Sequence, residues 1–229
     1  MLERFISLWE FLKTLSPRAF LRSRQQRARF KALRERAEAG EAVAQHDLVE
    51  LYFLGIGCTR DAAQAVAWLL KAAEQGYAVA QHNLGFRYAN GLGVPQDDAQ
   101  AVAWYRKAAE QGYAYAQHNL GLMYANGRGV PQDDGQAVLW WSQAADQGFA
   151  DADAAIGWMY ENGRGVPQDD TQAVAWYRKA AEQGYADAQN NLGWMYENGR
   201  GVPQDDGQAV AWYRKAAEQG VADANYNLG

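Results

Sequence analysis

The three histidines of this 229-residue sequence are the first residues whose chemistry calls for examination. His46, His82 and His118 lie 36 residues apart, and imidazole is a common metal ligand. If these equivalent positions fall on stacked helices, they lie about 8–10 Å apart, whereas a Zn–N bond is about 2.0–2.1 Å long. We therefore expect no metal ion and no cofactor at this row of histidines.

Paired carboxylates are the second set that could do chemistry, as general acids and bases. Asp-Asp pairs stand at positions 97/98, 133/134, 169/170 and 205/206. Catalysis needs one sheltered constellation with shifted pKa values rather than four equivalent copies, so the pairs favour helix capping. The NGxGV segments lack the Lys and Ser/Thr of a phosphate-binding loop. The sequence thus predicts a protein that is not an enzyme.

Nearly all of the chain after residue 40 repeats with a period of 36 residues. A fixed period of this length is typical of a solenoid, in which each unit packs only on its neighbours. The repeat is marked by Trp68, Trp104, Trp140, Trp176 and Trp212. The expected units are 41–76, 77–112, 113–148, 149–184, 185–220 and a partial unit, 221–229.

The second unit predicts two helices joined by a turn. The first, helix A, shows an apolar arc and should end at Asn90, because the following glycines accept a left-handed backbone. The second, helix B, should begin at Asp97, with the carboxylate capping an N–H and Gln100 reaching back to the N–H of Asp97. Within helix B, Trp104 is expected to fill the space between helices among small residues.

The string A-x-A-Q-x-x-L-G-x-x-Y-x-x-G-x-G-V followed by D-x-x-x-A-x-x-W-x-x-K-A-A-E-Q-G resembles the Sel-like (Sel-one-like) repeat, a relative of the tetratricopeptide repeat. Clear examples are NLGFRYANGLGV at 83–94 and NLGWMYENGRGV at 191–202, and the resemblance covers residues 41–229. It implies an all-α fold, a right-handed α/α superhelical solenoid of helix-turn-helix repeats. It also implies a scaffold for protein complexes, without naming the partner.

Two departures from the repeat stand out. The third unit replaces AWYRKAAEQG with LWWSQAADQG, which removes two positive charges at Ser142 and Gln143 and adds Trp141. Cys58 takes the place of a valine and is expected to act as a small apolar residue rather than a reactive thiol. Some members of the family carry two cysteines per repeat, and their absence here argues against that disulfide-linked branch.

The candidate binding surface is the side of helix A opposite its packed arc. By resemblance to tetratricopeptide arrays, this side is the concave one, where a peptide or helix of a partner docks. The expected partner-binding residues are His82, Phe86, Tyr115, His118, Leu122, Asp151, Trp158, Glu161, Asp187, Asn190, Trp194 and Glu197.

This face changes in character along the chain, from apolar residues with histidines to acids with tryptophans. Glu161 and Glu197 replace alanines of earlier units, so a basic partner segment with apolar anchors would suit the second half. The alternative, which the sequence leaves open, is that Trp158 and Trp194 pack between neighbouring A helices and bind nothing.

The first forty residues differ from the rest in charge. They hold ten Lys/Arg against four Asp/Glu, a formal charge of +6, while residues 41–229 carry −11. Residues 1–16 predict a short amphipathic helix, and the segment after Ser16-Pro17 predicts a second helix that caps the array. Residues 1–36 could instead contact an anionic membrane. Nucleic acid is not the expected partner, because basic charge alone is nonspecific.

The sequence shows no clear signal peptide and no apolar run of the roughly 18–20 residues that cross a bilayer. We expect a cytoplasmic protein, or one peripheral to the membrane. The leading prediction is a non-enzymatic, bacterial protein–protein interaction scaffold. The alternative is a peripheral membrane protein localised by its basic amphipathic N-terminus.

Overall fold

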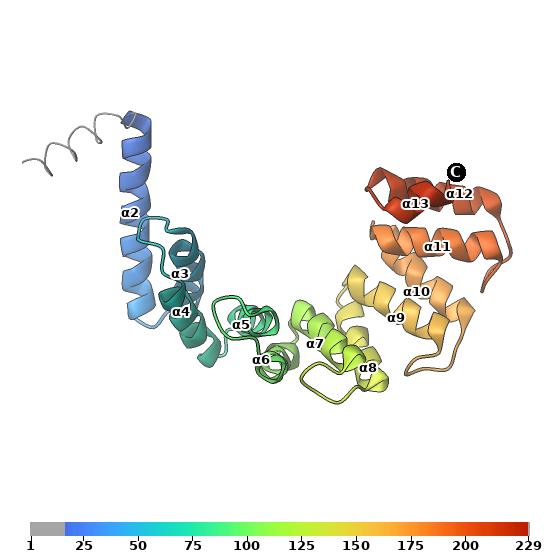
Figure 1. The fold of residues 1–229 in the computed structure, drawn as a ribbon, viewed down its shortest axis with the longest axis horizontal. Helices are drawn as coiled ribbons and strands as arrows, with labels where there is room; N and C mark the ends of the chain where they lie inside the picture. Colours follow the sequence, from blue (N-terminus) through green and yellow to red (C-terminus); the bar gives the residue numbers. More distant parts are fainter. Residues whose placement is uncertain (1–16, 229) are drawn as a thin grey trace, which may run out of the picture. The chain divides into compact units, whose positions relative to one another are not determined.

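The computed structural model of the chain describes residues 17–228, in which every regular element is a helix (Figure 1). The all-α class is therefore confirmed. The long first helix is α2 (Pro17–Glu38). The A helices are α3 (Ala42–Leu54), α5 (Ala78–Asn90), α7 (Ala114–Asn126), α9 (Ala150–Asn162), α11 (Ala186–Asn198) and the short α13 (Ala222–Asn227), and the B helices are α4 (Ala62–Glu74), α6 (Asp98–Glu110), α8 (Asp134–Ala145), α10 (Asp170–Glu182) and α12 (Asp206–Glu218).

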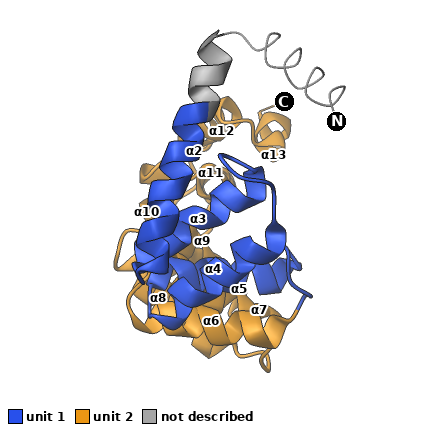
Figure 2. Ribbon diagram, turned by 90° about the vertical axis from the view of Figure 1, so that its left-hand side faces the viewer, with its two compact units in different colours: residues 1–96 blue, residues 97–229 orange. Residues whose placement is uncertain are grey.

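The chain divides into two compact units, Met1–Gln96 and Asp97–Gly229, coloured separately in Figure 2. In the first unit, α3 packs against both α2 and α4, and α5 packs on α4. In the second unit, each A helix packs on the B helix before it and on the B helix after it, from α6 to α12. Each unit is thus a run of antiparallel helical hairpins in which contacts join neighbours along the chain.

The helix ends lie where the sequence predicts them. Helix α5 ends at Asn90, and Gly91 follows with φ of 66°, a left-handed conformation that glycine adopts without steric cost. At the start of α6, Asp97 Oδ1 accepts a hydrogen bond from the Gln100 N–H at 2.9 Å. The corresponding aspartates of the other units make the same cap, at Asp61, Asp133, Asp169 and Asp205.

The second half of the predicted capping box is not formed as expected. In the third repeat, 113–148, the N–H of the cap residue Asp133 donates to the carbonyl of Tyr124 at 3.0 Å, rather than to a glutamine side chain. The cap residues Asp61, Asp169 and Asp205 donate in the same way to Tyr52, Tyr160 and Tyr196. The start of each of these B helices is therefore tied to the last turn of its own A helix.

The predicted role of the repeating tryptophan accounts for only part of the packing. Trp68 and Trp104 are buried, but Trp140, Trp176 and Trp212 are partly exposed. The residue after each tryptophan lies deeper, and Tyr177 is fully buried. A Cβ added at Gly157 on α9 would lie only 2.7 Å from Cδ1 of Tyr177. Glycine on helix A therefore makes room for the tyrosine ring of helix B.

The glutamines of the repeat form hydrogen bonds that link successive hairpins. In α7, the side chain of Gln117 donates to the Ala109 carbonyl at 3.2 Å and accepts a hydrogen bond from Gln147 at 2.7 Å. Gln189 bonds in the same way to Ala181 and Gln219. One side chain thus satisfies the C-terminal end of one B helix and contacts the end of the next.

Helix α2 packs on α3 as a B helix would. The side chain of Gln45 donates to the Ala37 carbonyl at 3.1 Å, and a Cβ added at Gly57 would lie 2.5 Å from the Gln26 carbonyl oxygen. The same two relationships recur between later A helices and the B helices that precede them. The expected N-terminal helical cap is therefore present from Pro17 on, whereas the amphipathic helix expected at 1–16 lies outside the described residues.

Candidate partner-binding face

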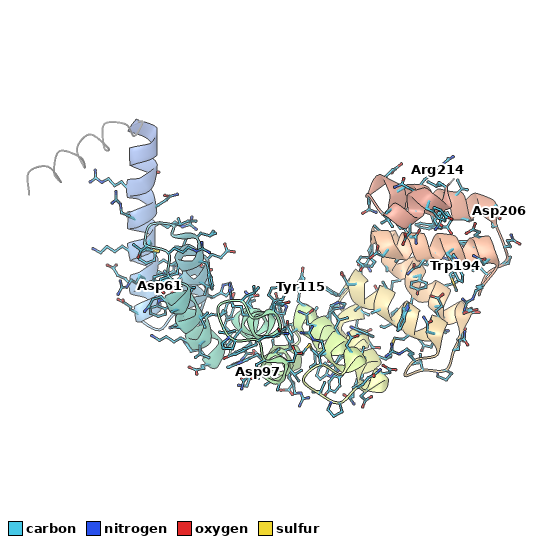
Figure 3. The ribbon with its side chains drawn as sticks, in the orientation of Figure 1. Asp61, Asp97, Tyr115, Trp194, Asp206 and Arg214 are labelled. Carbon is cyan, nitrogen blue, oxygen red and sulfur yellow. The ribbon has the colours of Figure 1, made fainter. Side chains whose placement is uncertain are left out.

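Large apolar side chains are exposed on the A helices of the second unit. Tyr115 and Leu122 on α7 are 55% and 38% exposed, and Trp158 on α9 is 41% exposed. Figure 3 labels Tyr115 on α7 and Trp194 on α11. Helices α7 and α9 thus carry exposed apolar side chains on the predicted face, whereas Trp194 on α11 is only partly exposed.

An aromatic cluster surrounds the exposed tyrosine. The ring of Tyr115 meets that of Phe149 edge-on at 4.8 Å, and the His118 ring lies 5.3 Å from the same phenylalanine. Burial lowers the pKa of His118. The partly buried His118 therefore packs behind Phe149, while the ring of Tyr115 is exposed to solvent.

The two tryptophans of the predicted face differ in their surroundings. Trp194 is partly buried and packs against the cluster that contains Leu192 and Met195, whereas Trp158 is the more exposed. A guanidinium group lies over each ring, Arg164 over Trp158 and Arg200 over Trp194, both at 5.1 Å from the ring centroid. Trp158 is therefore the better candidate anchor, and Trp194 has a packing role as well.

The acids of the predicted face fall into two groups. Glu161 accepts a hydrogen bond from the Tyr177 hydroxyl at 2.7 Å and lies 3.4 Å from Arg200, and Glu197 accepts one from Tyr213 at 2.7 Å. These two carboxylates satisfy the hydroxyls of buried tyrosines. This use of Glu161 and Glu197 was missed by the sequence analysis.

The second group of acids lies in the first turns of α9 and α11, at Asp151 and Asp187. There each carboxylate is favoured by the helix dipole. The pKa of Tyr185 is raised, first by burial and then by the negative charges of Asp151 and Asp187. Asn190 lies on the same helix as Asp187 and accepts a hydrogen bond from Asn227 at 3.3 Å.

Of the two predicted residues in Met1–Gln96, Phe86 lies along a cleft of about 480 Å³, whereas His82 is not among the residues that line it. Phe86, 47% exposed, forms part of its wall. Asn83 joins two histidines, because its side-chain N–H donates to His46 Nε2 at 2.8 Å while its oxygen accepts from His82 Nδ1 at 3.2 Å. The cleft is lined by Arg29, His46, Asp47, Val49, Glu50, Leu51, Asn83, Phe86 and Arg87.

In the first three of the four Asp-Asp pairs, the second aspartate makes a contact that the sequence did not predict. Arg164, from the turn after α9, donates to both carboxylate oxygens of Asp134 at 2.9 and 2.7 Å. Arg128 pairs with Asp98 and Arg200 with Asp170 in the same geometry. Beside this contact, a Cβ added at Gly165 would lie 2.5 Å from the Asp134 carbonyl. We refer to this arginine–aspartate pair with its glycine as the clamp.

Comparison of the repeats shows how the clamp could have been found from sequence. One repeat before Asp98 and Arg128, the corresponding residues are Ala62 and Leu92. Both members of the pair are absent together, which is the signal expected of two residues in contact.

Along residues 17–228, no helix has both the length and the apolar character needed to span a membrane. Exposed arginines on α2 include Arg24 and Arg29. Arg34 forms an ion pair with Glu38 at 2.7 Å, and Arg36 pairs with Glu41.

Comparison with protein families gives matches to the model for the Sel1 repeat at residues 42–77, 78–113, 114–149, 150–185 and 186–221. Among solved structures, a Sel1 repeat protein from Oxalobacter formigenes is 40% identical with a TM-score of 0.76, over 87% of this chain and 58% of that one. A protective antigen of uropathogenic Escherichia coli strains, which displays an SLR fold, is 39% identical with a TM-score of 0.52, over 87% and 50%.

A third structure, a Sel1 repeat protein from Klebsiella pneumoniae, shares the fold at 24% identity and a TM-score of 0.54, over 87% of this chain and 97% of that one. The chain thus spans 58% and 50% of the lengths of the first two structures. No curated protein sequence matches the chain.

Proposed function

Because this chain belongs to the Sel1 repeat family, whose repeats are typical of protein–protein interaction scaffolds, we propose that it is a non-enzymatic adaptor that binds a peptide or helix of a partner protein. The proposed contact surface is the exposed side of α7, α9 and α11 in the second unit. The observation that carries the proposal is the exposure of Tyr115, Leu122 and Trp158 on successive A helices, since clustered exposed apolar residues mark interaction sites.

The chemistry of this surface favours a partner segment with apolar anchors and positive charge. Trp158 offers a large, rigid ring, a side chain enriched among residues that dominate binding energy. Asp151 and Asp187 supply negative charge to this surface. The Glu161 carboxylate does not, because it is bonded to the Tyr177 hydroxyl and paired with Arg200. Opposite charge on the partner would raise the association rate and select the partner.

The test is a photo-crosslinking amino acid placed at Leu122 in the full chain, expressed in its native host, followed by mass spectrometry of the crosslinked product. We expect a protein partner crosslinked through a basic, apolar segment. Trp158→Ala with Asp187→Lys should abolish this crosslink, while Val210→Ala, at an exposed position on α12, should preserve it. Retention of the crosslink by the double variant would exclude this face.

A second candidate is peripheral contact with an anionic membrane through the basic N-terminal segment. The exposed Arg24 and Arg29 on α2 favour it, because basic residues near an anionic lipid surface each contribute roughly 1 kcal/mol. Co-sedimentation with phosphatidylserine vesicles should require residues 1–16 and should weaken with salt. Equal sedimentation without that segment would leave only α2 as the contact, and no sedimentation of the full chain at low salt would remove this candidate.

A further inference from the structure

Four of the five repeating helix-B tryptophans have a lysine ammonium group over the ring, and the fifth does not. Lys71, Lys107, Lys179 and Lys215 lie over Trp68, Trp104, Trp176 and Trp212, with Nζ 3.8–5.0 Å from the ring centroid. Each lysine follows its tryptophan by three residues, one helical turn. On α8, Gln143 follows Trp140 at this spacing, and a neutral amide replaces the ammonium group. The partly exposed Trp140 therefore keeps its ring but lacks the lysine that its counterparts have.

The C-terminal end of α8 also lacks the positive charge of the other B helices. Helices α4, α6, α10 and α12 each carry a lysine in the last turn, whereas α8 has no basic residue there and is followed by Asp146. The C-terminal end of a helix bears a partial negative charge that a cation stabilises. The ring of Trp140, the helix end and the Asp146 carboxylate thus all favour an added cation.

Two further substitutions change the same surface. Leu139, 50% exposed, stands where the other units have alanine. Ser142 replaces the arginines that bond to tyrosine hydroxyls elsewhere, as Arg106 does to Tyr124 at 2.7 Å. The first repeat, 41–76, also lacks this arginine and has Leu70 in its place, but it keeps Lys71. Among the repeats, only the third, 113–148, lacks both the arginine and the lysine, and it gains the exposed Leu139.

We propose that the surface formed by Leu139, Trp140, Gln143 and Asp146 on and beside α8 docks a basic segment of a partner protein. A lysine or arginine of the partner lies over the Trp140 ring near Asp146, in the position that the chain's own lysine takes in other units. A neighbouring apolar side chain of the partner packs against Leu139. The formal charge of −11 on residues 41–229 favours approach of such a segment. This surface is on a B helix and does not depend on the proposed helix-A face.

A purely structural explanation of Gln143 competes with this proposal. Its side-chain oxygen accepts a hydrogen bond from Gln117 at 3.3 Å. Gln117 is already bonded to Ala109 and Gln147, however, and other units retain the glutamine linkage with lysine at this position, as Gln189 does with Gln219 and Lys215. The glutamine is therefore not needed for the linkage.

The experiment uses the full chain labelled with ¹⁵N in its indole groups and titrated with an acetylated, amidated pentapeptide, Ala-Leu-Lys-Leu-Ala. The Trp140 Nε1 is buried without a hydrogen-bond partner within the described residues, and its resonance reports on the ring. We expect this resonance to shift on titration. Gln143→Lys, which supplies the cation from the chain itself, should weaken binding about fivefold, as should norleucine in place of the peptide lysine.

Matched variants separate this surface from others. Lys215→Gln creates the same vacancy over Trp212, and the peptide should then shift the Trp212 resonance, which it leaves unchanged in the parent chain. Leu139→Ala should weaken binding at Trp140 without altering the fold, because other units have alanine there. Trp158→Ala should leave the titration unchanged. Equal binding by the parent chain and Gln143→Lys, equal binding of the norleucine peptide, or no shift at Trp140 would overturn the proposal.

Discussion

Asp153 and Lys179 form an ion pair, with 2.7 Å between the carboxylate and the ammonium nitrogen, at a position where the other A helices from α3 to α11 bury a glutamine. The carboxylate is fully buried, whereas the lysine is 44% exposed. Lys179 also donates to the Ala145 carbonyl at 2.9 Å, and Gln183 donates to Asp153 at 2.8 Å. The lysine thus supplies the donor that glutamine supplies elsewhere, and it lies farther from its tryptophan, at 5.0 Å, than Lys215 does at 3.8 Å.

We predict that Asp153→Gln stabilises the protein by about 1 kcal/mol near neutral pH, because a buried charge is replaced by the amide of the other units. Burial raises the pKa of Asp153 in spite of Lys179. The native state therefore binds a proton more tightly than the unfolded chain, and stability falls as pH rises through the folded pKa. Urea denaturation should show the gain shrinking as pH is lowered. A gain that is independent of pH would contradict this account.

The same pair predicts a coupling between two substitutions. Lys179→Met leaves the Asp153 carboxylate buried without its cation and should cost about 2 kcal/mol, less than for a fully buried pair because Lys179 is partly exposed. In the Asp153→Gln background, the cost should fall to that of the control, Lys215→Met. A double-mutant cycle by urea denaturation measures the difference. Equal costs in both backgrounds would show that the two residues act independently.

A glycine-to-alanine change in helix α11 should reverse the usual sign. Alanine normally stabilises a helix interior by about 1 kcal/mol relative to glycine. At Gly193, however, the new Cβ would lie 2.7 Å from Cδ1 of Tyr213, so overpacking should produce a net loss of about 2 kcal/mol. Tyr213→Leu should recover much of it, because the first unit combines Val49 with Leu69 at these positions. Thermal unfolding of Gly193→Ala, of Tyr213→Leu and of the variant with both substitutions tests the prediction, which fails if Gly193→Ala alone raises the melting temperature.

The clamp predicts a pH dependence of the opposite sign from that of Asp153. Hydrogen bonds from Arg164 lower the pKa of Asp134, so this contribution is present above the unfolded pKa and is lost as pH falls through the folded one. Arg164→Gln should cost about 1 kcal/mol at neutral pH, since the pair is partly exposed. The difference from the parent chain should decrease in acid and in high salt, leaving the part that comes from the contacts of Arg164 with the Ala125 carbonyl and the Trp158 ring. Urea titrations at neutral and acid pH measure it, and an equal loss at both pH values would show that the Asp134 pair contributes nothing.

Installing the clamp where it is absent gives the reciprocal prediction. Ala62→Asp with Leu92→Arg should slow hydrogen exchange in the turn after α5, because it recreates the pair formed by Asp98 and Arg128. Either substitution alone should have little effect. If the double variant exchanges no more slowly than both single ones, the pair does not form at this position.

The helix bounds could be predicted because their causes are local. Asn90-Gly91 ends α5 and Asp97 caps α6 through atoms within a few residues of one another. The clamp was missed because its partners lie 30 residues apart, in different repeats. The helical period placed Trp104 on a packed face but could not show that its neighbour Tyr105 lies deeper.

The candidate face was predictable to a similar depth. Exposure of Phe86, Tyr115, Leu122 and Trp158 follows from the helical period alone. The tie of Glu161 to the Tyr177 hydroxyl depends on how a B helix packs on its A helix, which one helix at a time does not reveal. Comparison of units within the chain would have helped, because Glu161 and Glu197 appear where earlier units have alanine.

At Gly165, main-chain atoms of one repeat meet those of the preceding helix start with no side chain between them. The interval between these neighbours is therefore set by peptide groups, whose dimensions do not vary with sequence. Outward-facing residues can then be exchanged freely without altering the spacing at which they are displayed. Such an array can acquire a new binding specificity by point substitution while its architecture remains the same.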